Sequence, residues 1–175
     1  MSTGQAGDEA RATVGVAVAP ERAFEIFTQQ VDLWWRRGRR FRNAPGDAGL
    51  IRIEPGVGGR LFESFATDAG EQVVEIGRTC IWEPPHRLVL SWRASNFAPH
   101  ETTEVEVLFR AVGKGTHVTV VHRGWAAIRP DHPARHGQDV TAFLRMMGLW
   151  WGDQLSLLRI LASGPMASPP EPNPP

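Results

Sequence analysis

Two histidines, His132 and His136, lie four residues apart and are bracketed by Asp131 and Asp139. Imidazoles at this spacing could share one helical turn and hold a metal ion. However, no glutamate lies between the histidines, Gly137 would end such a helix at once, and no third ligand is evident. Zinc sites usually need three or four protein ligands. We therefore expect an ordinary polar loop here, with no metal and no other cofactor.

His122 and Glu63 are the other side chains that could transfer protons. His122 lies two residues after Val120 in a predicted strand, so its side chain should point inward. A hydrogen-bonded core histidine is the favoured reading, followed by a polar anchor in a ligand cavity and last by a general base, because no partner carboxylate can be placed near it. Glu63 alternates with Leu61 and Phe65. An edge-facing glutamate is favoured over a catalytic acid, since buried carboxylates are rare unless paired, and we assign no catalytic residue.

Residues 36–42, with the sequence RRGRRFR, are the strongest local concentration of charge, and Trp34 and Trp35 precede them. Such a segment could contact nucleic acid, a phosphate-bearing ligand or a membrane surface. The whole chain, however, has 19 basic and 19 acidic residues and a formal net charge of zero, and no known nucleic-acid-binding motif accompanies the cluster. We favour a solvated loop, leave a phosphate-bearing ligand or a membrane surface open, and expect no nucleic-acid partner.

The remaining signals exclude several classes of protein. The chain has no GxSxG, CxxC, phosphate-binding glycine loop or dinucleotide-binding motif. Its one cysteine, Cys80, fits a reducing compartment. The first residues resemble no signal peptide, and no apolar run approaches the roughly 20 residues of a membrane span. We expect a cytoplasmic protein that does not insert into a membrane.

The longest predicted element, residues 138–162, is a helix with an apolar face about half its circumference wide. A helix of this kind needs a large surface to pack against. About seven strands precede it, near 13–19, 50–54, 60–66, 72–82, 87–94, 103–110 and 116–124, and two short helices (21–30 and 31–35) follow the first strand. Their short connections favour an antiparallel sheet. We predict an α+β domain over 12–163, between a flexible arm (1–11) and a disordered proline-rich tail (164–175).

Several strings resemble one known family. They are APERAFEIFTQ followed by DLWW, then GVGGRLFE, WEPPHRLVLSW, TEVEVLFRAVGKGTHVTVVHRGW, and a last helix containing Trp151. Together they resemble a START-like (SRPBCC, helix-grip) domain of the group homologous to the activator of the 90-kDa heat-shock-protein ATPase. The resemblance implies a curved sheet around the C-terminal helix with a cavity between them. It places the family's helix tryptophan at Trp151 and its strand-end tryptophan at Trp92. Trp150 replaces a common glycine and could narrow the cavity.

The leading functional hypothesis is therefore the binding of a small hydrophobic or aromatic molecule, including a lipid, between the helix and the sheet. Apolar clefts with few polar groups are typical of ligand sites. Thr103 and His122 would orient the ligand. The predicted apolar lining consists of Trp82, Trp92, Leu144, Met147, Trp151 and Leu155. Two alternatives remain open: a cyclase-, aromatase- or hydrolase-like enzyme using the same cavity, and a co-chaperone-like module that binds a protein partner or forms a homodimer.

Overall fold

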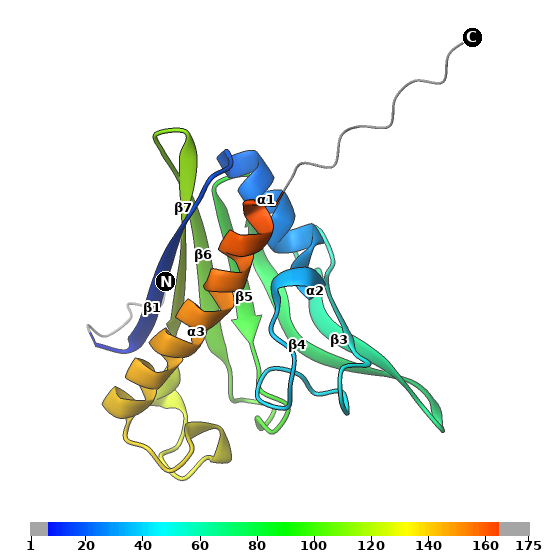
Figure 1. Cartoon of the computed structure of the whole chain (residues 1–175). Helices are drawn as coiled ribbons and strands as arrows, with labels where there is room; N and C mark the ends of the chain where they lie inside the picture. Colours follow the sequence, from blue (N-terminus) through cyan, green and yellow to red (C-terminus); the bar gives the residue numbers. More distant parts are fainter. Residues whose placement is uncertain (1–6, 165–175) are drawn as a thin grey trace.

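The computed structural model describes residues 7–164, and within them one seven-stranded antiparallel sheet curves around a long helix (Figure 1). The strands lie in the sheet in the order β1-β7-β6-β5-β4-β3-β2. Their bounds are β1 Glu9–Val16, β2 Leu50–Ile53, β3 Arg60–Thr67, β4 Gly70–Glu83, β5 Arg87–Trp92, β6 Thr103–Val112 and β7 Gly115–Arg123. Helices α1 (Pro20–Gln29) and α2 (Val31–Trp34) follow β1, and α3 (Val140–Ala162) ends the fold. The predicted α+β helix-grip architecture is confirmed.

The two faces of the sheet differ because buried and exposed side chains alternate along its strands. In β6, Thr103, Val105, Val107 and Phe109 are buried, and the residues between them are more exposed. The pairing register shifts between Leu61 and Phe62 in β3, and again between Thr79 and Ile81 in β4. Irregularities of this kind bend a strand and increase its twist. They help the sheet to curve around α3.

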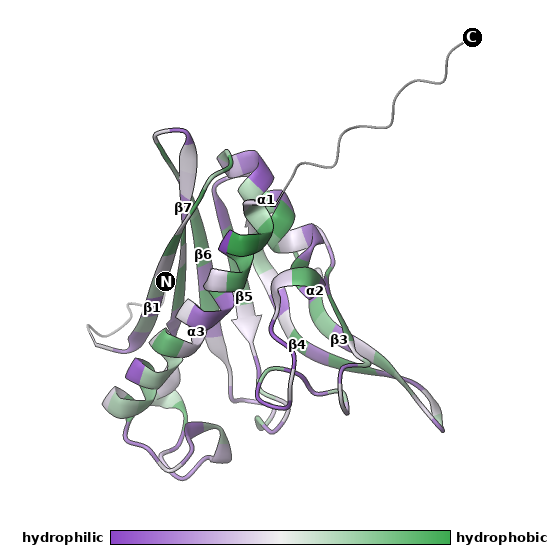
Figure 2. Ribbon diagram, in the orientation of Figure 1, coloured by the Kyte–Doolittle hydropathy of each residue, from purple (hydrophilic) through white to green (hydrophobic). Residues whose placement is uncertain are grey.

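Helix α3 crosses the concave face of the sheet (Figure 1). The Asp139 side chain caps its N-terminus by accepting a hydrogen bond from the Ala142 backbone N–H at 2.9 Å. In its second half, Leu155 and Leu158 are each 1% exposed, and the region where these turns lie beside α1 is mostly apolar (Figure 2). Among residues 7–164, no helix is long and apolar enough to cross a membrane.

The first strand begins earlier than its sequence pattern indicated. Residues 9–11, which we had assigned to the flexible arm, pair with residues 121–123 of β7. Their outward polar side chains hide the alternation, because Ala10 is the one buried side chain among the three. The rest of the predicted arm, residues 1–6, and the predicted tail beyond Gly164 lie outside the described residues.

Arg42 joins α2, the loop that follows it and β2. Its guanidinium lies inside the protein, with a side chain 1% exposed, and donates to Asp32 Oδ1 at 2.7 Å. It also donates to the backbone carbonyls of Asp32, Trp35, Arg36 and Gly49. The interpretation of 36–42 as a solvated loop is therefore wrong for Arg42, because the loop folds around this side chain and uses it to satisfy its own carbonyls.

Asp32 is the counterion of this arginine. Burial acts to raise the pKa of its carboxyl group, but hydrogen bonds from the Ile51 N–H and Arg42, and the charges of Arg42 and Arg37, outweigh burial and lower the pKa overall. The ionised carboxylate therefore holds α2, the arginine-rich loop and the start of β2 together.

Glu63 is also buried, contrary to the prediction that it faces an edge. It is 0% exposed, and its Oε2 accepts a hydrogen bond from the Asn43 N–H at 2.6 Å. Residues 43–49 cover this part of β3 so closely that a Cβ at Gly49 would clash with Glu63 Oε1. Strand alternation could not predict this cover, because it comes from a loop distant in the sequence.

Replacing Arg42 with lysine should lower the free energy of unfolding by about 2–4 kcal/mol. Lysine keeps the charge near Asp32 but lacks the planar fork that reaches several carbonyls. Urea denaturation of the purified variant measures the loss. Arg40→Lys, an exposed change in the same loop, is the control and should shift stability by no more than about 0.5 kcal/mol. Equal stability of the two variants would contradict the role given to Arg42.

Candidate functional site

A cavity of about 880 Å³ opens between the first half of α3, the loop after α2, the middle of β4 and the end of β5. We call it the aromatic cavity because six aromatic side chains line it: Trp35, Phe41, Trp92, Trp125, Phe143 and Trp150. Its polar lining is concentrated in the loops, and includes Arg39, Arg40, Asn43, Ser95, Asn96, His136 and Gln138. An apolar interior with polar groups at its rim is the usual composition of a small-molecule site.

One wall of the cavity is the arginine-rich loop, which docks onto α3. Phe41 stacks on Trp150 with ring centroids 5.4 Å apart and an interplanar angle of 11°. The Arg36 guanidinium lies over the ring of Phe41, 5.4 Å from its centroid. The Arg36 backbone N–H donates to Gln154 Oε1 at 2.8 Å, and its side chain pairs with Asp153 at 3.5 Å. These contacts hold the wall against the helix.

A second boundary of the cavity is formed by the loop after β5 and the segment before α3. The His132 Nδ1 accepts from the Ala134 N–H at 3.0 Å, so in the neutral ring the proton is on Nε2. Nε2 lies 3.1 Å from Glu101 Oε2 and 3.2 Å from the Asn96 carbonyl oxygen. The Ala98 N–H bond to the Glu101 carboxylate, together with nearby positive charge, lowers the pKa of Glu101. The contact between His132 and Glu101 therefore joins the two loops. Neither ring nitrogen of His132 is free to bind a substrate or a metal.

His122 belongs to a chain of hydrogen bonds beneath the cavity. The indole N–H of Trp151 can only donate, and it lies 3.2 Å from His122 Nδ1, which must accept. Nε2 therefore carries the proton of the neutral imidazole and donates to Thr103 Oγ1 at 2.8 Å. The Thr103 hydroxyl in turn donates to the Trp92 carbonyl oxygen at 3.3 Å. Both nitrogens of the ring are occupied, so the general-base role considered for His122 has no free atom.

The environment keeps His122 neutral. Its side chain is 0% exposed, and burial lowers its pKa to about 3. Trp92, Trp125 and Trp151 surround the ring with centroid distances of 5.5, 5.1 and 6.1 Å. A protonated imidazole here would lose the Trp151 hydrogen bond, because Nδ1 would then also be a donor.

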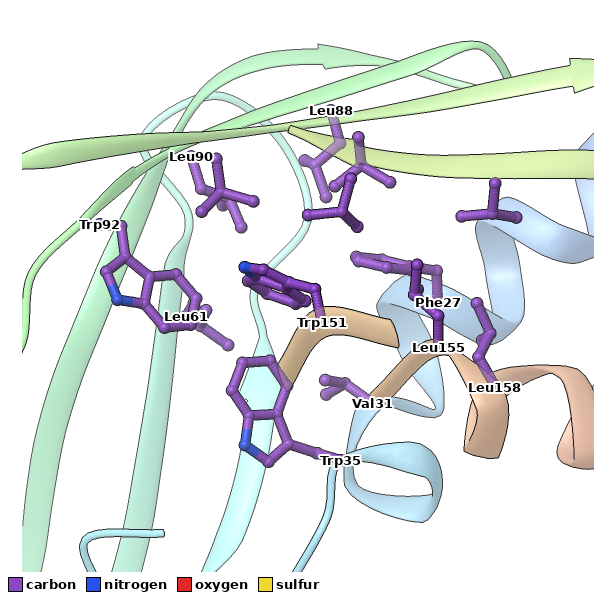
Figure 3. Packing of buried hydrophobic residues seen from close by; sticks show 14 of the residues in the cluster. Phe27, Val31, Trp35, Leu61, Leu88, Leu90, Trp92, Trp151, Leu155 and Leu158 are labelled. Atoms are coloured by element: carbon purple, nitrogen blue, oxygen red, sulfur yellow. The ribbon is translucent and has the colours of Figure 1, made fainter. Parts of the chain in front are cut away.

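The eight residues predicted to contact a ligand lie in five places. Trp92 and Met147 line the aromatic cavity. Trp151, His122 and Thr103 lie in the core beneath it, and Figure 3 shows Trp151 at the centre of this packing, with Trp92 and Trp35 beside it. Leu155 packs in the closed second half of the helix, and Trp82 lies against Phe24 at 5.2 Å. Leu144 borders a separate, shallower groove beside β1.

Sequence reasoning missed most of the cavity wall. Trp35, Phe41, Trp125 and Phe143 were not among the predicted ligand residues. Trp150 was expected to narrow one end of a cavity, and it does line one. The position of Trp35 beside the arginine-rich segment, and of Phe41 within it, was a usable signal, which we had considered only for nucleic acid, a phosphate-bearing ligand or a membrane surface.

The metal site that the spacing of His132 and His136 could have formed, and that we did not favour, gains no support. Within residues 7–164, no group of three or more histidine, cysteine, aspartate or glutamate side chains is arranged to hold a metal ion. The two histidines also differ in setting: His132 is buried, whereas His136 is exposed at the cavity rim with φ = 52°.

The low pKa of His122 predicts a pH-dependent stability. The unfolded chain binds a proton at this residue below about pH 6.5, whereas the folded protein does so only near pH 3. The free energy of unfolding should therefore fall by about 2 kcal/mol from pH 7 to pH 5 through this residue. Urea denaturation at both pH values tests this. His122→Gln should lose most of the fall, and His117→Gln, at an exposed histidine, should keep it. An unchanged pH dependence in His122→Gln would contradict the prediction.

The chain is similar to several proteins of known structure. It shares 20% identity with an HSP90 activator from Plasmodium falciparum, covering 91% of this chain and 99% of that one, with a TM-score of 0.58. It shares 16% identity with the Aha1 dimer from Colwellia psychrerythraea, covering 89% and 98%, with a TM-score of 0.55. For the anthrahydroquino-gamma-pyrone synthase Txn09 complexed with SUM, the identity is 27%, the coverage 92% and 99%, and the TM-score 0.56. The first two likenesses show a shared fold.

No curated protein matches the chain significantly. A family model described as "Activator of Hsp90 ATPase homolog 1-like protein" matches residues 17–147, from just after β1 into the first turns of α3. These residues include most of the aromatic cavity wall. Because the match spans well over half of the sequence, the chain belongs to the family of activator of Hsp90 ATPase homolog 1-like proteins.

Proposed function

We propose that this protein binds a small, flat aromatic molecule in the aromatic cavity. The observation that carries the proposal is the cavity itself, with about 880 Å³ of space bordered by six aromatic side chains. Ligand pockets typically enclose roughly 300–1,000 Å³, so the space suits a molecule of several fused rings. Aromatic walls favour flat partners, since rings stack on one another face to face or meet edge to face.

The organisation of α3 supports this location for the ligand. The second half of the helix packs closely against the sheet and α1, with Leu155, Leu158 and Ala162 buried. The first half faces the cavity through Phe143, Met147 and Trp150. A ligand would therefore lie near the N-terminal half of α3, beside the arginine-rich loop, and not along the whole helix as the sequence had suggested.

The likeness to the Txn09 synthase is consistent with an aromatic ligand. It is 27% identical over nearly the full length of both chains, and its name describes a synthase of a fused-ring aromatic product. Catalysis by this chain would need a proton-transfer group facing the ligand. His122 has no free nitrogen for that task, so we propose binding as the function and assign no catalytic residue.

A second candidate is action on a protein partner, as the family description and the HSP90 activator from Plasmodium falciparum suggest. Leu149 and Ile160 are 71% and 65% exposed. They lie eleven residues apart, close to three helical turns, and so share one face of α3. An exposed apolar pair on one helix face is a surface that a partner could cover.

Mutation of the cavity wall tests the first candidate. Trp150→Ala should weaken the binding of anthraquinone-2-carboxamide, a flat neutral tricyclic probe, by about tenfold or more, because large aromatic contacts dominate binding energies. Isothermal titration calorimetry measures the affinity. Trp82→Ala is the matched control: Trp82 is half-buried on β4, lies outside the cavity and should leave the affinity unchanged. A loss of affinity in Trp82→Ala but not in Trp150→Ala would place the ligand elsewhere.

The second candidate is tested with a purified Hsp90 ATPase. If the protein stimulates this ATPase through α3, the double variant Leu149→Asp/Ile160→Asp should reduce the stimulation at least severalfold, because charge on an apolar contact face must be desolvated. Leu50→Asp, a change at an exposed leucine on β2, is the control. Absence of any stimulation by the unmodified protein would remove this candidate and leave the first one unaffected.

A further inference from the structure

The charges around the aromatic cavity are unbalanced. Arg39 and Arg40 lie exposed at its rim, and within the described part of the chain neither forms an ion pair or a side-chain hydrogen bond. The two acidic lining residues are already paired: Glu75 with Arg78 at 2.7 Å, and Asp153 with Arg36 at 3.5 Å. Within the described residues, Arg39 and Arg40 at the rim therefore have no carboxylate of the protein as a counterion.

Two further arginines add positive charge without a carboxylate. Arg93, which also lines the cavity, donates to the carbonyl oxygens of residues 97, 98, 99 and 101. These bonds fix its guanidinium but leave its charge uncompensated. Arg135 is 4% exposed and donates to the Ile128 carbonyl at 3.1 Å, and among residues 7–164 its Nε has no partner. Its chain neighbours Ala134 and His136 line the cavity. A buried charge without a counterion is unfavourable.

The unsatisfied polar atom of the cavity lining is also a donor. Trp125 is 3% exposed, and its indole N–H has no acceptor in the described part of the chain. Buried donors without acceptors are rare in folded proteins. Around the cavity, the protein thus presents aromatic surface, uncompensated arginines and a spare N–H, which is the complement of an acceptor-rich anion.

We propose that the natural ligand of the aromatic cavity is an aromatic acid, a flat ring system carrying a carboxylate that Arg39 and Arg40 bind at the rim. This inference rests on the proposed function and specifies its ligand class. Arginine suits the task, because its planar fork pairs with both oxygens of a carboxylate. The rings would lie against Trp150 and Phe41, with the carboxylate toward the arginine-rich loop.

The nearest alternative is a neutral aromatic ligand with solvated arginines at the rim, as surface arginines often are. The two cases differ in one measurable quantity, the ratio of affinities for an acid and its uncharged analogue. Anthraquinone-2-carboxylate and anthraquinone-2-carboxamide have the same ring system and nearly the same shape, and so isolate the effect of the negative charge.

The experiment measures both affinities by isothermal titration calorimetry at low ionic strength. The unmodified protein should bind the carboxylate about tenfold more tightly than the carboxamide, as hydrogen bonds to a charged group predict. In the double variant Arg39→Gln/Arg40→Gln this preference should fall below about twofold, with the carboxamide affinity unchanged. Arg52→Gln/Arg110→Gln removes two exposed arginines on β2 and β6, outside the cavity, and should keep the preference.

Each other outcome has a definite meaning. Equal affinities for acid and amide in the unmodified protein would overturn the inference while leaving aromatic binding intact. Loss of the preference in both double variants would overturn it too, because the effect would then come from net charge. If neither probe binds, the proposed function fails along with the inference. Because both arginines are exposed, unfolding is not expected, and thermal denaturation of each variant checks this.

Discussion

The hydrogen bond from the Trp151 indole to His122 is the constraint on which the helix–sheet packing depends. It ties the middle of α3 to the C-terminal end of β7, and it continues through Thr103 on β6 to the Trp92 carbonyl at the end of β5. Each polar group in this series of hydrogen bonds is buried, and leaving it without its partner would cost free energy of folding. These hydrogen bonds therefore determine how far α3 can approach the sheet. The aromatic cavity begins just beyond this point.

The arginine-rich loop completes the site, and its shape depends on groups that never contact a ligand. Arg42 satisfies the loop's carbonyls from inside, and Glu63 holds the Asn43 N–H. With these two side chains buried, Phe41 packs on Trp150, and Arg39 and Arg40 remain at the rim. Within one short segment, Arg42 is buried and holds the loop together, whereas Arg39 and Arg40 are exposed. A count of charges cannot distinguish the two groups, because the difference comes from which carbonyls lie within reach.

Membership of the family and the shape of the fold leave the function open, because one fold can carry unrelated activities. The similar proteins include an HSP90 activator and a synthase. The cavity of this chain combines an aromatic wall with uncompensated positive charge. That combination is consistent with the proposed small-molecule ligand, since six aromatic side chains line one concave space.

The sequence by itself determined the architecture. Hydrophobic periodicity predicted the strand near residues 103–110 and the helix over residues 138–162, because such signals depend on neighbours a few residues apart. Its resemblance to the family was sufficient to predict the curved sheet around the helix. The position of the cavity was decided by the tertiary structure. Trp151 and His122 have inward-facing patterns like those of Trp92 and Met147, yet they lie in the core while the latter two line the cavity. Inward direction follows from periodicity, but the presence of open space depends on how loops far apart in the sequence pack together.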